Sequence, residues 1–275
     1  MTAHRILLIG ALSLLCSCSP GRWAVNEQND YFTLFNKDHD YTQGLIVSHE
    51  NENRSISVGQ KIFTAVHKKE APAPSDERPY AGYLFTEFRK YSDEPPIGER
   101  PYAAIELGFV GPGALGKEAQ CGVHRMLGQL CPKGWPQQLD AEPGITLRAG
   151  TSITKSTDFL FTKGEIVYDV EGELGNISTG LILGNTVRYR LAPGLTAFAG
   201  PKLHLVAHDI FLDGNTFQKS ASVTRNWAFS ELGGGVVMDI PYFPRTTWFI
   251  KIQSKQYKEQ GGTYNHGGVE FSWEN

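Results

Sequence analysis

The chain has few long apolar runs. Past its first residues, none of the 275 residues belongs to a run of the ~18 apolar residues that a membrane-spanning helix needs. This excludes a helical membrane protein and leaves a soluble globule or a membrane β-barrel. The chain also lacks an excess of one charge, since its net charge is −3 with 20% charged residues. There is no broad basic field of the kind that binds nucleic acid, so no nucleic-acid partner is expected.

Common catalytic motifs are missing as well. No G-x-S-x-G elbow occurs, so an α/β-hydrolase is not expected. Neither H-E-x-x-H nor a pair of C-x-x-C motifs occurs, and there is no phosphate-binding G-x-x-x-x-G-K-[ST] loop. Any chemistry has to come from a combination of shorter features.

The segment Met1–Ser19 has the pattern of an export signal rather than of a folded element. His4 and Arg5 form a short basic start, and 6–15 is an apolar stretch of the length expected for a signal core. The residues up to Cys18 resemble a bacterial lipoprotein box, which would place a lipid on Cys18. They equally fit an ordinary cleavage region, and both interpretations stay open. The mature domain is expected to span 25–275.

Export changes how the four cysteines are interpreted. Cys121 and Cys131 remain after the signal, an even pair in an oxidising compartment, so a disulfide between them is plausible, and whether it forms stays open. A continuous helix would hold them ~15 Å apart, which is too far for a bridge. The helix must therefore end and turn back before Cys131, and Pro132 and Gly134 suit such a turn.

The rest of the chain alternates between apolar and polar residues with a period of two. Roughly a dozen such segments recur to the last residues, at about 20 residues per strand plus connection, which is typical of a transmembrane barrel. This predicts an all-β, antiparallel up-and-down β-barrel of about twelve strands. Clear examples are 103–109, 145–149, 166–170, 187–191, 248–252 and 269–273.

Periodicity alone does not separate this barrel from a soluble periplasmic β-sandwich that binds a ligand. In a sandwich the apolar face is the core, whereas in a barrel it meets lipid. The export signal, a chain that ends inside a strand, and aromatic residues near strand ends favour the barrel. Examples of these aromatic residues are Tyr83, Tyr102, Trp248 and Trp273.

One segment, Ala114–Leu130, lacks the alternation and carries helix-forming residues after a turn-rich start. On such a helix Gln120 and His124 are four residues apart and share a face. A helix on a connection between barrel strands is expected to lie over one mouth. Taken alone, His124 could be a structural residue, and Arg78-Pro79 is typical of a solvated turn.

Six short motifs occur in order along the chain: Asn29-Asp30, 40–44 (DYTQG), 77–82 (ERPYAG), 111–114 (GPGA), 120–124 (QCGVH) and Gly134-Trp135. Together they resemble the outer-membrane lipid A 3'-O-deacylases. They extend from about residue 27 to 140, while the second half of the chain matches only in its alternation. The resemblance implies a twelve-stranded outer-membrane barrel, expected to be a monomer. It also implies a calcium-dependent esterase that removes the 3'-linked acyloxyacyl chain of lipid A in the outer leaflet.

The resemblance also assigns roles to particular residues. His124 matches the histidine that acts as a general base on water, and Gln120 matches the glutamine one turn before it. Asn29 and Asp30 match the calcium-binding pair. Thr42 matches an inward-facing threonine nearby, although it could simply be a lumen residue beside Gly44. A lysine of the site matches Lys68 or Lys69, and the two stay open.

This assignment is chemically coherent. An imidazole can take a proton from water near neutral pH, so no serine nucleophile is required. Calcium prefers oxygen ligands such as those of Asn29 and Asp30, and Lys68 could bind a phosphate group. Two rivals stay open: a non-enzymatic porin, adhesin or structural barrel, and an outer-membrane phospholipase with a Ser-His-Asn arrangement. No feature of the sequence points to a serine beside His124.

Overall fold

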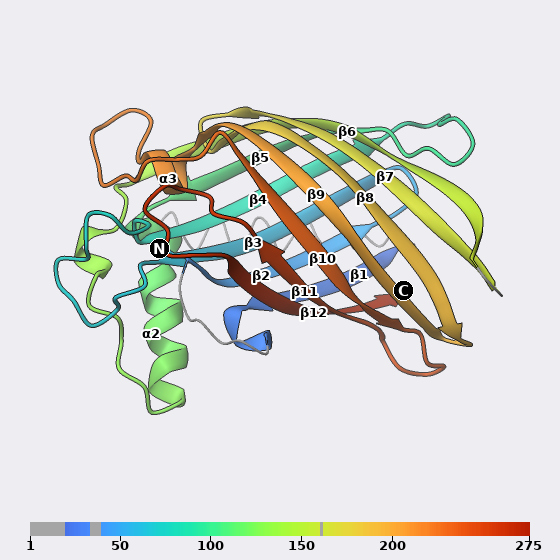
Figure 1. Ribbon diagram of the computed structural model, residues 1–275, viewed down its shortest axis with the longest axis horizontal. Coiled ribbons are helices and arrows are strands. Elements are labelled where there is room, and N and C mark those ends of the chain that lie inside the picture. Colours follow the sequence, from blue (N-terminus) through green and yellow to red (C-terminus); the bar gives the residue numbers. More distant parts are fainter. Residues whose placement is uncertain (1–19, 34–39, 160–161) are drawn as a thin grey trace.

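The computed structural model describes residues 20–33, 40–159 and 162–275 (Figure 1). Twelve antiparallel strands form a closed barrel in which each strand pairs with its neighbours in sequence and β12 closes onto β1. The predicted all-β up-and-down barrel is confirmed. The strands are β1 (Arg22–Asn29), β2 (Asp40–Glu50), β3 (Arg54–Thr64), β4 (Ala81–Tyr91), β5 (Tyr102–Val110), β6 (Glu142–Phe159), β7 (Thr162–Gly175), β8 (Ser178–Ala192), β9 (Leu195–Asp209), β10 (Ala228–Met238), β11 (Arg245–Gln253) and β12 (Tyr264–Glu274).

The export signal predicted for residues 1–19 lies outside the described residues, and so does the Cys18 whose lipidation was left open. Strand β1 begins at Arg22, slightly before the domain start expected at residue 25. No helix among the described residues has the length and apolar character needed to cross a bilayer.

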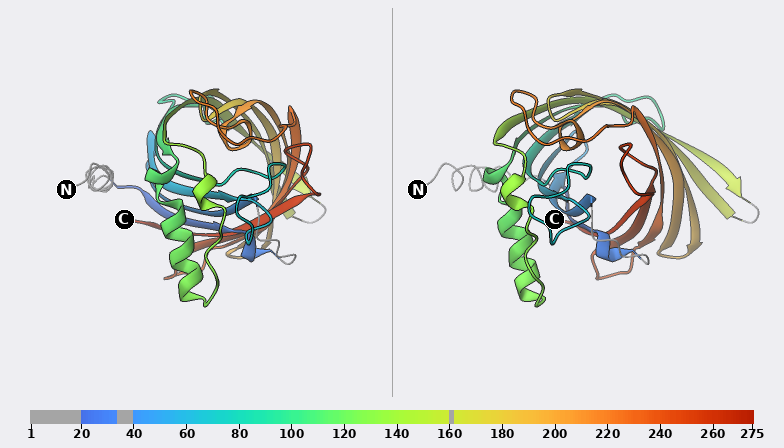
Figure 2. Two further views of the ribbon diagram at one scale, coloured as in Figure 1. Left: turned by 90° about the vertical axis from the view of Figure 1, so that its left-hand side faces the viewer. Right: turned by 60° about the vertical axis from the view of Figure 1, so that its left-hand side comes forward.

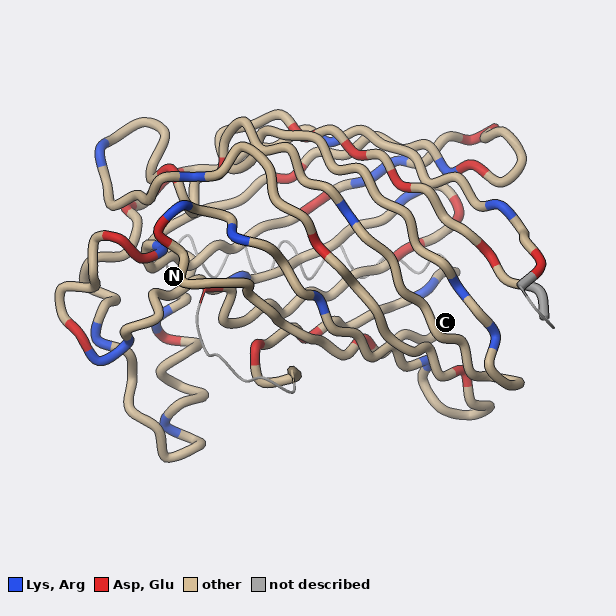
Figure 3. The backbone as a smooth tube through the Cα atoms, viewed as in Figure 1, with Lys and Arg blue, Asp and Glu red and all other residues tan. Residues whose placement is uncertain are grey.

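The predicted alternation sets the two faces of the wall. Inside, Arg148 bridges three carboxylates, with N···O distances of 2.8 Å to Glu106, 3.0 Å to Glu87 and 2.9 Å to Glu173. Charges of both signs are interspersed along the strands (Figure 3), which leaves these buried groups paired. The outward positions carry exposed apolar side chains, as a lipid-facing wall requires. Examples are Leu45, Leu107, Ile145, Leu147, Tyr168, Val170, Leu183, Leu203, Leu232, Trp248 and Phe271.

The two ends of the barrel differ in their connections. One end has short turns, such as 51–53 and 193–194. The first residue of β1 and the last residue of β12 also lie at this end. The other end has long connections that carry the helices, at the left in Figure 1. Outer-membrane barrels keep their longer loops outside the cell, so this is the extracellular end. Its helical segments are η1 (Asp30–Phe32), η2 (Pro112–Ala114), α2 (Gly116–Met126), η3 (Trp135–Gln137) and α3 (Ile210–Asp213).

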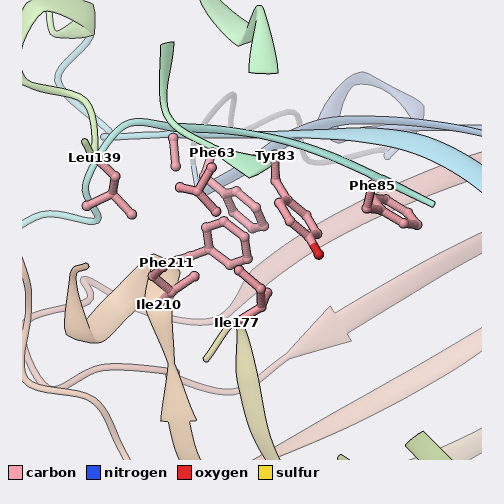
Figure 4. Packing of buried hydrophobic residues seen from close by; sticks show 9 residues of the cluster. Phe63, Tyr83, Phe85, Leu139, Ile177, Ile210 and Phe211 are labelled. Atoms are coloured by element: carbon pink, nitrogen blue, oxygen red, sulfur yellow. The ribbon is translucent and has the colours of Figure 1, made fainter. Parts of the chain in front are cut away.

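An apolar cluster packs across the lumen at the extracellular end (Figure 4). Helix α3 contributes Ile210 and Phe211, and the Phe211 ring stacks on Phe63 with a centroid separation of 4.1 Å. Tyr83 meets the same ring edge-on at 5.6 Å. Ile177 joins them from the connection between β7 and β8. Apolar side chains from α3 and from β3 and β4 thus pack against one another across a lumen that is polar elsewhere.

Helix α2 is shorter than the predicted Ala114–Leu130. Leu115, with φ +59°, separates η2 from α2 at the start. At the end, Gly128 has φ +71°, its N–H donates to the Arg125 carbonyl, and the Gln129 N–H donates to the His124 carbonyl. This is a Schellman cap, which needs the left-handed conformation that glycine supplies. The turn is therefore made at Gly128, earlier than expected.

The Cys121–Cys131 disulfide, which the sequence left open, is present, with a Cα–Cα distance of 4.7 Å. It joins α2 to the segment that returns from it. The expectation that the helix covers a mouth is wrong. Figure 2 shows α2 at the extracellular rim, extending past the barrel wall. The reason is that the start of α2 packs against the outside of the wall, where Gly116 meets Gly82 of β4.

Candidate active site

The start of α2 is fixed against the outer wall by two glycines. A Cβ atom on Gly82 would lie 2.9 Å from the Gly116 nitrogen, and one on Gly116 would lie 2.8 Å from the Gly82 Cα atom. Such contacts admit no side chain at either position. Gln60 of β3 adds a hydrogen bond from Nε2 to the Ala114 carbonyl at 2.6 Å. Gly82, which ends the motif at 77–82, and Gly116, two residues after the motif at 111–114, therefore hold the helix close to β3 and β4.

The Gln120 side chain is buried and its orientation is fixed. Its Oε1 atom accepts a hydrogen bond of 2.9 Å from the indole N–H of Trp135, which can only donate. Trp135 is itself buried, with Tyr80 packed edge-on at 5.3 Å. The amide Nε2 of Gln120 is then a buried donor with no partner among the described residues. Leaving such a donor unsatisfied costs about 1–3 kcal/mol, so it is suited to an acceptor carried by a ligand.

The His124 ring lies on the same face of α2, as predicted, and is 8% exposed. Its Nδ1 atom lies 2.8 Å from the Leu130 carbonyl oxygen. A carbonyl only accepts, so Nδ1 carries the hydrogen and Nε2 keeps its lone pair. The Gly128 turn and the Cys121–Cys131 disulfide hold Leu130 in place. His124 is thus set in the tautomer that can take a proton at Nε2.

Asn29 and Asp30 lie where β1 passes into η1. The Asn29 Oδ1 atom caps η1 by accepting from the Tyr31 N–H at 2.9 Å, and the Asp30 side chain is fully buried. The Tyr31 hydroxyl accepts a hydrogen bond of 2.9 Å from Gln129. Because Gln129 directly follows the Gly128 turn, this bond joins the Asn29–Asp30 segment to the end of α2.

Thr42 lies at a β-bulge between Tyr41 and Gln43 in the β2–β3 ladder. Its hydroxyl is 2.6 Å from that of Thr64, and both groups are buried. A bulge puts two successive residues opposite one partner, which here is Ile62 of the cluster outside the wall. The alternation that placed Thr42 on the inner face beside Gly44 is therefore wrong at this position, since the bulge shifts the phase.

Of the two candidate lysines, Lys68 has a buried ammonium group, whereas Lys69 is exposed. The Lys68 carbonyl accepts a hydrogen bond of 2.8 Å from the Lys133 N–H. Lys68 is thereby joined to the segment that returns from α2, and Lys69 has no such placement.

Arg78 is not in a solvated turn. It is 3% exposed, and its Nε atom lies 3.2 Å from the Asp40 Oδ1 atom. The Tyr257 hydroxyl donates to the same oxygen at 3.2 Å, and Gln256 accepts from the Arg78 guanidinium. Burial raises the pKa of Tyr257, and the Asp40 carboxylate raises it further, so the phenol stays a donor. The pairing of Arg78 with a carboxylate 38 positions away left no local signal in the sequence.

The site residues thus lie around α2, and the hydrogen bonds among the described residues join them to other residues of this region rather than directly to one another. Within the described part of the chain, the hydrogen bonds of Gln120 and His124 are to Trp135 and Leu130. The same residues hold no group of three or more His, Cys, Asp or Glu side chains arranged for a metal. The Asn29–Asp30 segment is linked through Tyr31 and Gln129.

The comparison with family models decides the relationship. A model described as "Outer membrane protein LpxR" matches residues 6–191 and 189–275. The chain belongs to the LpxR family. Membership places the barrel in the outer membrane, as the sequence predicts. A comparison with curated proteins gave no match.

Among solved structures, the barrel is similar to LpxR from Salmonella typhimurium. The two share 22% sequence identity with a TM-score of 0.78, over 92% of this chain and 99% of that one. The KdgM porin in complex with disordered oligogalacturonate matches at 7% identity and a TM-score of 0.44, over 93% and 99% of the two chains. The translocator domain of the autotransporter NalP from Neisseria meningitidis matches at 12% identity and a TM-score of 0.42, over 97% and 93%.

Proposed function

We propose that this LpxR-family protein hydrolyses the ester that links the 3'-acyloxyacyl chain to lipid A in the outer leaflet. One structural observation supports the proposal in addition to family membership. The Nδ1 atom of the buried His124 is held by Leu130, and within the described part of the chain its Nε2 atom has no hydrogen-bond partner. The same is true of the Gln120 Nε2 group one helical turn away. That is the arrangement a water-attack esterase needs: a proton acceptor and a hydrogen-bond donor on one face.

In this reaction Nε2 of His124 takes a proton from a water molecule, whose oxygen attacks the ester carbonyl carbon. The carbonyl oxygen becomes an oxyanion, and the Gln120 Nε2 group donates a hydrogen bond to it. Collapse of the tetrahedral intermediate breaks the bond to the sugar oxygen, which takes the proton from His124. The products are the acyloxyacyl acid and a free 3'-hydroxyl group, and the enzyme returns to its starting state.

Asn29 and Asp30 would hold calcium. A carboxylate and an amide oxygen are the hard ligands that this ion prefers, and the Asn29 Oδ1 atom keeps a second lone pair beside its cap to Tyr31. Calcium takes 6–8 oxygens, so water, main-chain or substrate oxygens would complete the set. When bound, the ion would polarise the ester carbonyl. Lys68 would bind a phosphate of the sugar, and Thr42 would orient substrate beside Thr64.

The tip of α2 supports a substrate that comes from the lipid. Met126 at the end of α2, and Leu127 and Leu130 on the segment that follows, are 80%, 63% and 81% exposed. Figure 2 shows α2 extending past the barrel wall at the extracellular rim. Exposed apolar side chains on a helix that lies beside a barrel suit the boundary between headgroups and acyl chains. Since all the site residues come from one chain, we propose that the protein acts as a monomer.

The rival functions fit less well. A porin needs an open lumen, whereas the cluster around Phe211 packs across the lumen at the extracellular end. A phospholipase of the Ser-His-Asn type needs a serine hydroxyl at the histidine, whereas the hydrogen bond of the His124 ring within the described residues goes to Leu130.

Mass spectrometry of lipid A from cells that express the protein in calcium-containing medium tests the proposed function. The expected result is a lipid A lighter by the acyloxyacyl group. Unchanged lipid A would reject the enzyme.

A further inference from the structure

Glu27 is a carboxylate on the lipid-facing side of the wall. Its neighbours on β1 face the lumen, since Asn26 donates to Glu270 and Gln28 donates to Asn26 inside the barrel. The alternation of a strand therefore turns Glu27 outward. Its partners across the β1–β2 and β1–β12 ladders are Leu45 and Val269, so it lies within the apolar band.

This position is exceptional in the molecule. Among the described strand residues that alternate outward away from the strand ends, Glu27 is the one Asp or Glu. An ionisable side chain that faces lipid is unfavourable to the fold and is therefore a candidate for function. No other described residue forms an ion pair with it, so its charge is not there to complete a salt bridge of the wall.

Glu27 lies beside the candidate active site. Gln43 donates a hydrogen bond of 3.2 Å from Nε2 to one carboxylate oxygen of Glu27, and Gln43 is directly opposite Asn29 in the ladder. Along β1, Glu27 is two residues from Asn29, which is about 6.6–6.8 Å in a strand. It lies on the side away from η1, deeper toward the middle of the bilayer. Glu27 and Gln43 thus extend the polar site into the acyl-chain region.

We infer that the Glu27–Gln43 pair is a specificity-determining subsite that binds the 3-hydroxyl group of a hydroxyacyl chain on the same sugar as the scissile ester. This rests on the proposed function. A carboxylate only accepts hydrogen bonds, so its ligand must donate. Phosphate groups of the substrate would be repelled, and saturated methylene chains offer no donor. The 3-hydroxyl group lies near the head of its chain, so it passes the wall just below the reacting ester.

The test uses the full-length protein in detergent with two synthetic lipid A analogues, with and without the 3-hydroxyl group on the amide-linked chain. For the wild type, kcat/KM on the hydroxylated analogue should exceed that on the deoxy analogue by about tenfold or more, as for a hydrogen bond to a charged group. Glu27→Val should bring this ratio close to one. Glu27→Gln, which keeps an acceptor, should give an intermediate ratio. It also serves as the test if Glu27→Val does not fold.

Asn185→Val is the matched control, because Asn185 is another polar residue on the outer wall, paired with Tyr168 on β7. It should keep the wild-type ratio. A ratio unchanged by both Glu27 variants overturns the inference, and so does a Glu27→Val variant that alters only the calcium concentration needed. If the wild type cleaves neither analogue, the proposed function itself fails.

Discussion

The His124 Nδ1 atom lies 2.8 Å from the carbonyl oxygen of Leu130, and this pair sets the chemistry of the ring. Leu130 is outside α2, on the segment that turns back at Gly128. The tautomer of the proposed general base is therefore controlled by a turn rather than by another catalytic side chain. The Cys121–Cys131 disulfide reinforces that turn from the side.

Gly128→Ala should impair activity more than stability. A Cβ atom in the left-handed conformation costs about 1 kcal/mol, and the cap would relax by moving Leu130 away from His124. The expected result is a large loss of kcat with the barrel still folded, measured by deacylation kinetics and thermal unfolding. Gly122→Ala is the control, because a Cβ atom there meets nothing within 4 Å. Equal activities of the two variants would contradict this role of the turn.

Trp135→Phe should lower kcat about tenfold and leave KM nearly unchanged. The variant keeps an aromatic ring beside Tyr80 but removes the N–H that orients the Gln120 amide. Because the proposed contact of Gln120 is to the oxyanion, its loss acts on the transition state rather than on substrate binding. A rise in KM at constant kcat would instead assign Gln120 to ground-state binding.

Asp30→Ala should raise the calcium concentration required for half-maximal activity. The variant removes the one carboxylate of the proposed ion site, whereas Asn29 and its cap to Tyr31 remain. A calcium titration of the purified variant against the wild type measures the change. Superimposable titration curves would place the ion elsewhere.

The plugged mouth predicts that the protein does not conduct ions at neutral pH. Helix α3 is held through Asp213, which lies 3.2 Å from His208 and 2.9 Å from Arg225. Burial alone would raise the Asp213 pKa. The hydrogen bonds from His208, from the Asp209 N–H and from Arg225 outweigh burial, so the pKa is lowered overall. A carboxyl group whose pKa is lowered in the folded state stabilises the fold at pH values above its pKa in the unfolded chain, which is ~3.9 for aspartate. That stability is lost as pH falls through the lower, folded value.

Planar-bilayer recordings check this prediction. They should show no steps at neutral pH, and openings should appear only below about pH 4. Asp213→Asn should weaken the acid dependence, because its side chain does not titrate. Steady conductance of the wild type at neutral pH would contradict the plug and favour a porin.

Much of the fold could be predicted because its signal is local. Alternation within each strand sets the lipid and lumen faces, so the twelve-stranded barrel follows from short windows of sequence. The shared face of Gln120 and His124 follows from helical spacing, and the possibility of a Cys121–Cys131 bridge follows from the compartment. These features need no knowledge of distant contacts.

The rest depended on contacts between distant segments. The bulge at Thr42 shifts the strand phase by one residue, and no turn residue marks it. The burial of Arg78 depends on Asp40 and on the connection before β12. Helix α3 is only four residues long and becomes a plug because Phe63 and Tyr83 face it across the lumen. Sequence periodicity carries none of this information.

The most direct test of the account compares His124→Asn with the wild type, each purified as a folded barrel shown by heat-modifiable gel migration. Asparagine can still donate to the Leu130 carbonyl but has no basic nitrogen. Mass spectrometry of lipid A incubated with each protein in calcium should show loss of the 3'-acyloxyacyl chain with the wild type and intact lipid A with the variant. Equal deacylation by both proteins would contradict the proposal that His124 takes the proton from water.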